Sequence, residues 1–431
     1  MNREILRLAL PNILSNISVP LLSSVDTALM GHLSAAHLAA LGVAGMLFMF
    51  LYSNFGFLRM GTTGMTAQAL GAGEDGALSA TLWRAGLLAL GLGLALLILQ
   101  RPLFELGAWL LNMEPAYEPL AREYFVIRIW TAPAALGLYV LTGFFFGMQN
   151  ARYPLYVTLL VNLVNIVASL FFVWSLEWGI AGAAWGTVAA QYAGLAYGFW
   201  LLRRRYGARI RRPRWRVLVH SEALGRFFHV NRNIFIRTVA LTFALGFFYA
   251  RAAREGELTL SVMIVLMQFM IWMSFAIDGF ANAAESLTGR TYGARDRRGF
   301  DRAVRLSLAW GAGLALLFSL LYWFAGEALV RLFTDQEAVI RGVRPLLPLV
   351  GWLPLLAFAA FIYDGIFIGM TAVRAMRNAV LLSTALYVLA TWGLGAFLPP
   401  EWALWISFMG FFLLRGAVQY WLFRRYGWAL H

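Results

Sequence analysis

Asp26 is the ionisable residue whose position in the sequence points most directly to chemistry. It lies in the segment VDTALMG, well inside the first apolar stretch, and Pro20 precedes it by six residues. Burial in a low-dielectric environment disfavours the charged form of a carboxylate. Proline removes a backbone donor and can bend a helix. We therefore expect Asp26 to bind and release a proton and to couple that change to the bending of the first helix.

Three further polar residues could form hydrogen bonds with this carboxylate. Asn165, Ser169 and Thr187 each lie inside a long apolar segment, where polar side chains are uncommon. Hydrogen bonds between membrane helices also hold helices together, and each contributes about 0.6–2 kcal/mol. Each residue alone therefore fits either a proton-coupling site or a contact between helices.

Other charged residues also fall within apolar segments. A charge at the bilayer centre costs at least about 2.5–3.5 kcal/mol, so each one needs a structural or functional reason. Carboxylate–arginine pairs between helices would be a structural reason, and a transport path would be a functional one. These residues are Arg59, Arg128, Arg237, Asp278, Glu285 and Asp364.

The composition shows which elements must position these side chains. Of the 431 residues, 61% are hydrophobic and 13% are charged, whereas soluble domains average about 45–50% apolar and about 25% charged residues. A spanning helix needs about 20 largely apolar residues. The sequence therefore predicts an all-α integral membrane protein with twelve transmembrane helices. The predicted segments are residues 5–33, 36–70, 79–100, 120–148, 154–175, 180–202, 231–250, 258–288, 303–325, 340–370, 378–397 and 401–423.

The arginines indicate how these segments are oriented. If the N-terminus is cytoplasmic, most loop arginines fall on the inner side, as the positive-inside rule requires. An even number of spans then places both termini in the cytoplasm. The apolar stretch of residues 5–33 is too long for the apolar region of a cleavable signal peptide, so we expect it to be retained.

The stretch RRRYGARIRRPRWR, residues 203–216, is the longest polar interruption and lies near the middle of the chain. It predicts an N-terminal lobe of residues 1–202, a basic cytoplasmic linker of residues 203–226 and a C-terminal lobe of residues 227–431. The net charge of +14 is explained by such loops and by attraction to anionic lipids. We expect membrane lipids as partners and no nucleic acid, because the sequence contains no recognisable nucleic-acid-binding module.

The two halves of the sequence resemble each other. TGFFFGM at residues 142–148 matches DGIFIGM at 364–370, and FGFLRMGTTGMTAQALGA at 55–72 matches IDGFANAAESLTGRTYGA at 277–294. Both matches have the same offset of 222 residues, which indicates a duplication. Six helices per half is an even number, so the repeats are parallel. Two such lobes can rock about their interface and expose a central cavity to each side in turn.

We expect the cavity to be lined by aromatic, methionine and charged side chains. Aromatic rings attract cations and methionine adapts to varied shapes, although lipid-facing and core positions use the same residue types. The candidates are Met30, Phe144, Met148, Arg237, Phe275, Asp278, Tyr363, Asp364 and Phe367.

Enzyme chemistry is not expected. The sequence contains no HExxH zinc motif and no nucleotide-binding phosphate loop, its five histidines are scattered, and it has no cysteine. We therefore expect no metal site and no cofactor other than the coupling ion.

The sequence resembles the multidrug and toxic compound extrusion (MATE) family, and within it the DNA-damage-inducible protein F (DinF) branch. The similar segments include LALPNILSNISVPLLSSVDTALMGHL, NLVNIVASLFFVW and YDGIFIGMTAVRAMRN, and they extend over nearly the whole chain. The resemblance implies a V-shaped twelve-helix exporter in the bacterial inner membrane, acting as a monomer. It also implies antiport of amphipathic, often cationic compounds against protons or sodium ions.

The resemblance assigns coupling roles to particular residues. The family's first-helix aspartate corresponds to Asp26, and its sixth-helix threonine corresponds to Thr187. The fifth-helix pattern NIxLD keeps its asparagine at Asn165 but has Ser169 in place of the second acid. Asp364 matches an acid of the tenth helix, whereas the seventh helix lacks an acid and carries Arg237.

A single carboxylate suffices for a proton, whereas a sodium ion prefers several oxygen ligands. We therefore expect proton coupling, with sodium coupling as an alternative. A flippase of lipid-linked precursors is a further alternative, for which Arg59, Arg128 and Arg237 could supply positive charge.

Overall fold

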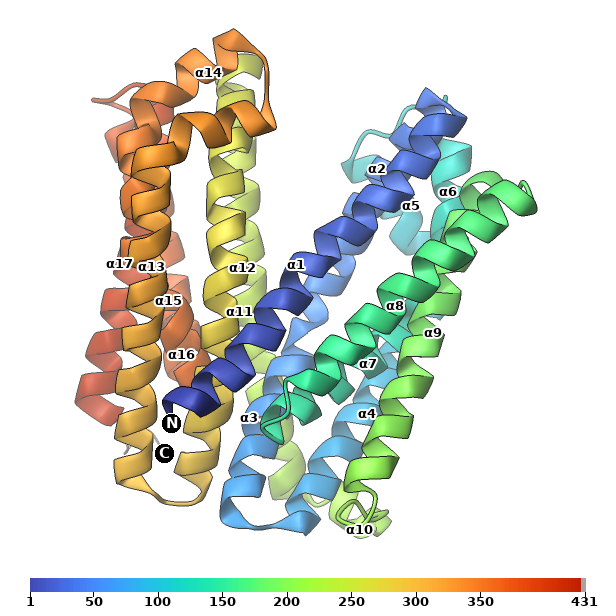
Figure 1. The fold of residues 1–431 in the computed structure, drawn as a ribbon, viewed down its shortest axis with the longest axis vertical. Coiled ribbons are helices and arrows are strands. Elements are labelled where there is room, and N and C mark those ends of the chain that lie inside the picture. The colour runs from blue at the N-terminus through green and yellow to red at the C-terminus, as the bar shows by residue number, and fades with distance from the viewer. Residues whose placement is uncertain (428–431) are drawn as a thin grey trace. The chain divides into compact units, whose positions relative to one another are not determined.

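The computed structural model describes residues 1–427, except for the side chains of residues 19–24 and 426. The described residues form helices joined by turns, without strands (Figure 1). The α-helices are α1 Asn2–Leu33, α2 Ala35–Ser53, α3 Phe57–Ala72, α4 Asp75–Ile98, α5 Gln100–Leu110, α6 Glu118–Arg128, α7 Ala132–Gly147, α8 Arg152–Leu170, α9 Gly179–Tyr206, α10 Trp215–Leu218, α11 Ser221–Arg254, α12 Glu257–Gly293, α13 Arg297–Phe333, α14 Glu337–Val343, α15 Leu347–Gly369, α16 Val373–Leu394 and α17 Pro400–Tyr426.

The predicted class is confirmed. Among the described residues, ten helical segments are long and apolar enough to cross a membrane. The two other long helices, α1 and α9, have 32 and 28 residues and correspond to the first and sixth predicted spans. The predicted bend at Pro20 falls among residues whose side chains lie outside the described part.

The structure refines the predicted boundaries in a few places. The predicted span 120–148 is interrupted by a 3-10 turn, Ile129–Thr131, so that α6 and α7 are separate helices. Pro133 follows at the start of α7, where its missing N–H is tolerated. The short helix α5 lies between spans and was not predicted, and a 3-10 turn, Arg344–Leu346, separates α14 from α15 within the predicted span 340–370.

The chain divides into two compact units. The N-terminal unit consists of residues 14–228, and the C-terminal unit consists of residues 1–13 together with 229–431. The chain therefore passes from one unit to the other inside α1 and again inside α11. The predicted lobes of residues 1–202 and 227–431 remain a prediction, and these units differ from it by placing residues 1–13 with the second half.

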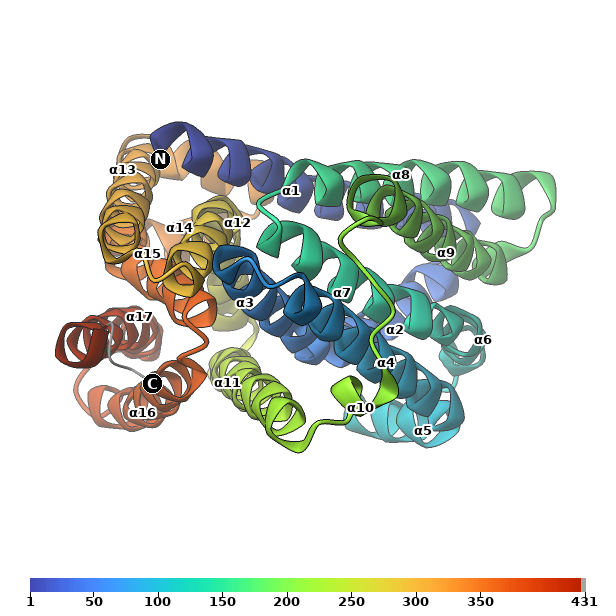
Figure 2. The same ribbon diagram turned by 90° about the horizontal axis from the view of Figure 1, so that it is seen from below.

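Local signals in the sequence explain how the helices end. Gly73 follows α3 with a φ of 73°, in the left-handed region that glycine adopts without strain. Asp296 precedes α13, and its side chain accepts a hydrogen bond of 2.9 Å from the backbone N–H of Gly299. Inside the units, α8 packs against α9 and α16 against α17, which are neighbours in sequence, whereas α12 packs against α15 and α3 against α7 (Figure 2).

Candidate functional site

Asp26 lies in the part of α1 that belongs to the N-terminal unit. Its side chain is buried, with 9% of the residue exposed. Its Oδ1 atom has no hydrogen-bond partner among the described residues. The positive charge of Arg128 and the hydroxyl group of Ser169 both act on this carboxylate. The charge of the carboxylate in turn acts on the phenol of Tyr124. One oxygen of this buried carboxylate is therefore left without the hydrogen bond that a buried polar atom normally has.

The other three predicted coupling residues lie on α8 and α9. Asn165 Nδ2 donates a hydrogen bond of 3.0 Å to Thr187 Oγ1, and this hydroxyl donates to the carbonyl oxygen of Ala183 at 3.1 Å. Asn165 Oδ1 and Ser169 Oγ are buried and have no hydrogen-bond partner among the described residues. The structure thus brings Asp26, Asn165, Ser169 and Thr187 into one polar site. Several oxygens of this site have no hydrogen-bond partner among the described residues.

A glycine allows α8 and α9 to approach each other at this site. A Cβ atom on Gly186 would lie 2.8 Å from the backbone nitrogen of Ser169 and 2.9 Å from its Cα. Small residues at such positions let membrane helices pack backbone to backbone. The backbone of α8 at Ser169 is consequently in direct contact with α9.

Arg128 and Tyr124, one turn apart on α6, complete the polar site. Arg128 Nη1 donates a hydrogen bond of 2.9 Å to Tyr124 OH, and its guanidinium lies 4.6 Å from the ring centre of Phe48. A pair with a carboxylate was one of the two explanations considered for Arg128. Its hydrogen bond is to the phenol of Tyr124, and its positive charge acts on Asp26. Tyr124 was missed, because a tyrosine near a helix end gives no signal until the neighbouring helices are known.

A second buried polar cluster lies in the C-terminal unit, around Asp364 on α15. Arg237 from α11 and Arg415 from α17 both donate to Asp364 Oδ2. Gln419 Nε2 donates to Asp364 Oδ1 at 2.5 Å. These four residues are at most 8% exposed. A carboxylate–arginine pair between helices, one of the two explanations considered for the charges within the spans, is therefore present for Asp364 and Arg237.

Sequence reasoning missed two members of this cluster. Arg415 is 2% exposed and lies in the last predicted span, where a charge should have drawn attention. Gln419 is four residues further on, on the same face of α17. The negative charge of Asp278 also acts on the guanidinium group of Arg415. The backbone carbonyl of Asp278 accepts a hydrogen bond of 3.4 Å from the side chain of Asn12. Glu285, on the same helix, is 1% exposed.

The predicted cavity residues are distributed over both units. Met30, Phe144 and Met148 are buried in the N-terminal unit, where the ring of Phe144 packs 5.8 Å from that of Tyr206. In the C-terminal unit, Tyr363 and Phe367 are buried, and the ring of Tyr363 packs 5.7 Å from that of Phe423. Phe275 and Asp278 are half-buried. A substrate cavity lined by these residues remains a prediction.

The described residues contain no group of three or more histidine, aspartate or glutamate side chains that could hold a metal ion. Around the Asp26 carboxylate, the buried polar atoms left without partners among the described residues include two neutral oxygens, Asn165 Oδ1 and Ser169 Oγ. Together with long apolar helices built from a repeated sequence, this arrangement is typical of a secondary transporter.

Comparison with known proteins identifies the family. The MatE family model matches this chain twice, over residues 11–171 and again over residues 234–392. The chain therefore belongs to the MatE family, whose members are multidrug efflux transporters. The double match also supports the internal duplication inferred from the sequence.

Individual relatives agree with this assignment. The chain is 35% identical over 435 residues to the DNA damage-inducible protein F of Escherichia coli, and the match covers 99% of this chain and 92% of the relative. It is 25% identical over 354 residues to a probable multidrug resistance protein NorM of Thermotoga maritima, covering 79% of this chain and 74% of that protein.

Solved structures show the same fold. A transporter of the MOP superfamily from Pyrococcus furiosus matches with a TM-score of 0.89 at 20% identity, covering 100% of this chain and 96% of that chain. The MATE transporter VcmN of Vibrio cholerae, in its bent form, matches with a TM-score of 0.87 at 20% identity, covering 100% and 97%. The fold is thus that of the MATE transporters.

Proposed function

We propose that this protein exports small amphipathic, often cationic organic molecules in exchange for protons, and that Asp26 carries the proton. The observation that supports the proposal most is the state of Asp26, a buried carboxylate with an oxygen that has no hydrogen-bond partner among the described residues. Such a group gains more from binding a proton than a carboxylate whose charge is already compensated.

Asp364 supports the same assignment by contrast. It is equally buried, but two guanidinium groups and the amide of Gln419 donate to its oxygens. These donors stabilise the ionised carboxylate. Asp364 is therefore suited to hold α11, α15 and α17 together, and Asp26 is the better proton carrier.

The composition of the Asp26 site favours a proton over a sodium ion. Ser169 stands where the family pattern has a second acid, so Asp26 is the carboxylate of this site, and the positive charge of Arg128 acts on it. A sodium ion would need several oxygen ligands beside this positive charge, whereas a proton needs one carboxylate oxygen.

Helix α1 provides a route by which proton binding could drive alternating access. Its first residues belong to the C-terminal unit, where Glu4 pairs with Arg290 at 3.2 Å and the amide oxygen of Asn2 accepts from Trp310 Nε1 at 3.3 Å. Asp26 lies further along the same helix, in the N-terminal unit. A change in α1 at Asp26 would therefore act on both units, consistent with a rocker-switch mechanism.

The proposal is tested by reconstituting the protein in liposomes and measuring efflux of a fluorescent organic cation under an imposed pH gradient. We expect Asp26→Asn to lose at least about tenfold of the gradient-driven rate, because a single lost ionisable group removes the coupling step. Asp301→Asn, on the exposed start of α13, is the control and should transport normally. Normal transport by Asp26→Asn would overturn the proposal, and export driven by a sodium gradient alone would replace the proton by sodium.

Flippase activity towards lipid-linked precursors is the second candidate, and the buried Arg237 and Arg415 are the observation that favours it. Both guanidiniums donate to Asp364, which reduces their capacity to bind a pyrophosphate. Translocation of a lipid-linked precursor by the reconstituted protein would decide in its favour.

We also propose that the protein lies in a bacterial inner membrane as a monomer, with both termini in the cytoplasm, because most loop arginines then face inward.

A further inference from the structure

We propose that residues 211–219 of the basic linker form a docking site for anionic phospholipid headgroups at the membrane surface. The proposal rests on how this segment is held in the N-terminal unit and on which side chains it exposes. It does not depend on the transported compound or on the coupling ion.

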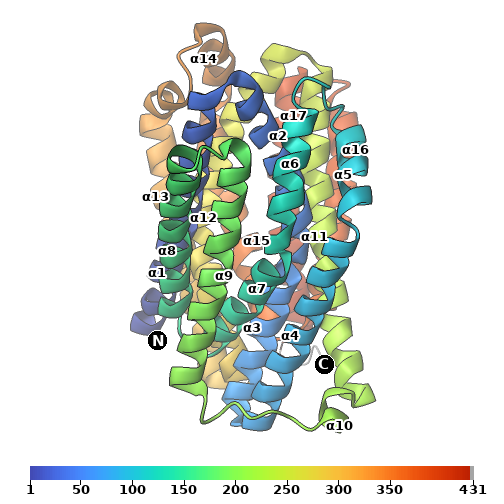
Figure 3. The same ribbon diagram turned by 90° about the vertical axis from the view of Figure 1, so that its right-hand side faces the viewer.

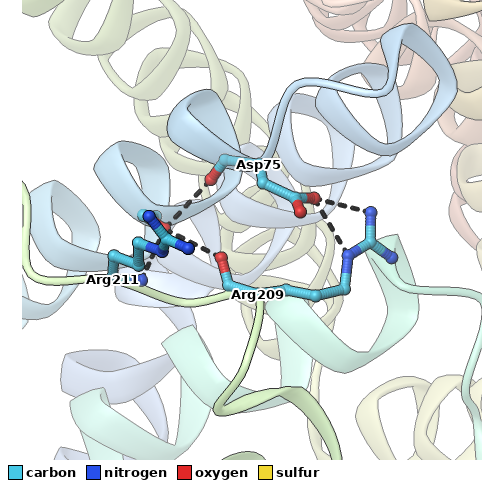
Figure 4. Close-up of polar contacts among 4 residues, drawn as sticks. Asp75, Arg209 and Arg211 are labelled. Carbon is cyan, nitrogen blue, oxygen red and sulfur yellow. Dashed lines mark hydrogen bonds and ion pairs between the residues drawn. The ribbon is translucent and has the colours of Figure 1, made fainter.

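The linker is fastened to the start of α4. Arg209 pairs with Asp75 Oδ1 through two contacts, of 2.9 Å from Nε and 2.6 Å from Nη2 (Figure 4). The backbone N–H of Arg211 donates to Ser79 Oγ at 3.1 Å. The path of the chain on either side of Arg211 is therefore set by contacts with a membrane-spanning helix.

The short helix α10 is fastened one turn further along α4. Arg84 Nε donates to the carbonyl oxygen of Leu218 at 3.0 Å, and Arg84 Nη2 donates to that of Val217. Leu218 is the buried side chain of α10, with 7% of the residue exposed. Figures 1 and 3 show α10 at the end of this unit where α9 finishes. The segment is thus placed at the end of spanning helices, where lipid headgroups lie.

The side chains exposed by this segment are of two kinds. Trp215, Val217 and Val219 are 68%, 47% and 45% exposed. Four arginines among and beside them are also exposed, namely Arg211, Arg212, Arg214 and Arg216. Tryptophan is enriched at membrane interfaces, and basic residues close to an anionic surface contribute about 1 kcal/mol each. Apolar and basic groups on one short segment match the boundary between headgroups and acyl chains.

The charge balance favours lipids that carry a net negative charge. Within residues 203–226 the sequence has nine arginines and a single acid, Glu222. Of these arginines, Arg209 has its charge compensated by Asp75. An acidic protein segment could satisfy the arginines, but it would leave the exposed tryptophan and valines without an apolar environment, whereas a bilayer surface supplies both.

The chain offers a matched control at the start of α13. Arg297, Arg298, Arg302 and Arg305 are four exposed arginines in the other half, and their apolar neighbours Phe300 and Val304 are buried. This site has the same number of arginines as residues 211–219, with one acid, Asp301, among them, but exposes no comparable apolar group. It separates specific docking from the general attraction of basic loops to an anionic membrane.

The test is hydrogen–deuterium exchange of the full chain in nanodiscs of phosphatidylcholine alone or mixed equally with phosphatidylglycerol. We expect the backbone amides of residues 211–219 to exchange at least about threefold more slowly in the anionic nanodiscs. Raising the salt from about 50 to about 500 mM should remove most of this difference, because it shortens the range of the attraction. This measurement needs only the unaltered protein.

Two fourfold variants complete the test. Changing Arg211, Arg212, Arg214 and Arg216 to glutamine should abolish the lipid-dependent slowing at residues 211–219, and the same change at Arg297, Arg298, Arg302 and Arg305 should leave it intact. Equal exchange in the two lipids would overturn the proposal, as would equal loss in both variants. Slowing that appears only when an acidic peptide is added would overturn it in favour of a protein partner.

Discussion

Gly143 and Gly365 have the same role in the two halves of the molecule. Each lies so close to a neighbouring helix that an added Cβ atom would collide with a backbone carbonyl oxygen, that of Arg59 for Gly143 and that of Ala281 for Gly365. Both the glycines and their partners are separated by 222 residues, the offset of the sequence repeat. The duplication therefore extends from matching residues to matching contacts between helices, α3 with α7 and α12 with α15.

We predict that Gly365→Ala destabilises the protein. The new methyl group would meet the backbone of α12, which cannot move aside as a flexible side chain could, and overpacking of this kind costs about 1–3 kcal/mol. Thermal unfolding in detergent is the measurement. Gly91→Ala on α4 is the control, because no atom lies within 4 Å of its added Cβ, and it should leave the melting temperature unchanged or raise it. Equal melting temperatures for both variants would contradict the packing argument.

Asp364→Asn is also expected to destabilise the protein. It would leave Arg237 and Arg415 buried without their shared carboxylate, and breaking a buried ion pair typically costs about 3–5 kcal/mol. Asp26→Asn removes a buried carboxylate that lacks such compensation, so its stability should be equal to or higher than that of the unaltered protein. Thermal unfolding of the two variants under one set of conditions compares these opposite expectations.

Arg128→Gln should change how export depends on pH. The substitution removes a positive charge that acts on Asp26, so the protonated carboxyl becomes relatively more favourable and is retained at higher pH. We expect the pH at which efflux is half-maximal to rise. Efflux rates between about pH 5.5 and 8.5 measure this shift. Arg59→Gln, at the start of α3, is the control, and a profile that changes equally in both variants would refute the role of Arg128.

A small pH effect is expected at an exposed ion pair outside the spans. A hydrogen bond of 2.6 Å from Arg122 holds the pKa of Glu105 below its usual value. A lowered pKa in the folded protein adds stability above the ordinary pKa of the group, and this stability is lost as the pH falls. Glu105→Gln should therefore lower the melting temperature slightly at pH 7 and not at about pH 2, well below the ordinary pKa of glutamate, where the carboxyl group becomes protonated. An equal effect at both values would rule out the electrostatic origin.

The sequence was sufficient to predict the spans and to single out the buried polar residues near Asp26, for physical reasons; their role in coupling remains a prediction. A polar residue in a long apolar segment is visible without any structure, because the membrane makes it costly. Asp26, Asn165, Ser169 and Thr187 stand out in this way, and the structure places them together. The repeat was visible because residues that pack backbone against backbone, such as Gly365, tolerate little change.

The sequence did not reveal which distant side chains meet. The partners of Asp364 come from helices 127 and 51 residues away along the chain, and hydrophobic periodicity contains no information about such pairs. Tyr124 was overlooked for the same reason. The 3-10 turn between α6 and α7 was also missed, because its residues Ile-Trp-Thr continue the apolar pattern of the flanking helices.

The membership of residues 1–13 in the C-terminal unit has a consequence for how the protein is made. These residues leave the ribosome first, but Glu4 contacts Arg290 and Asn2 contacts Trp310, which are separated from them by 286 and 308 positions. Translation has to pass the midpoint of the chain before the amino-terminal turns of the first helix can find their partners. Assembly of the second half around this early segment would then be a late step of membrane insertion, completed only when the whole polypeptide has been synthesised.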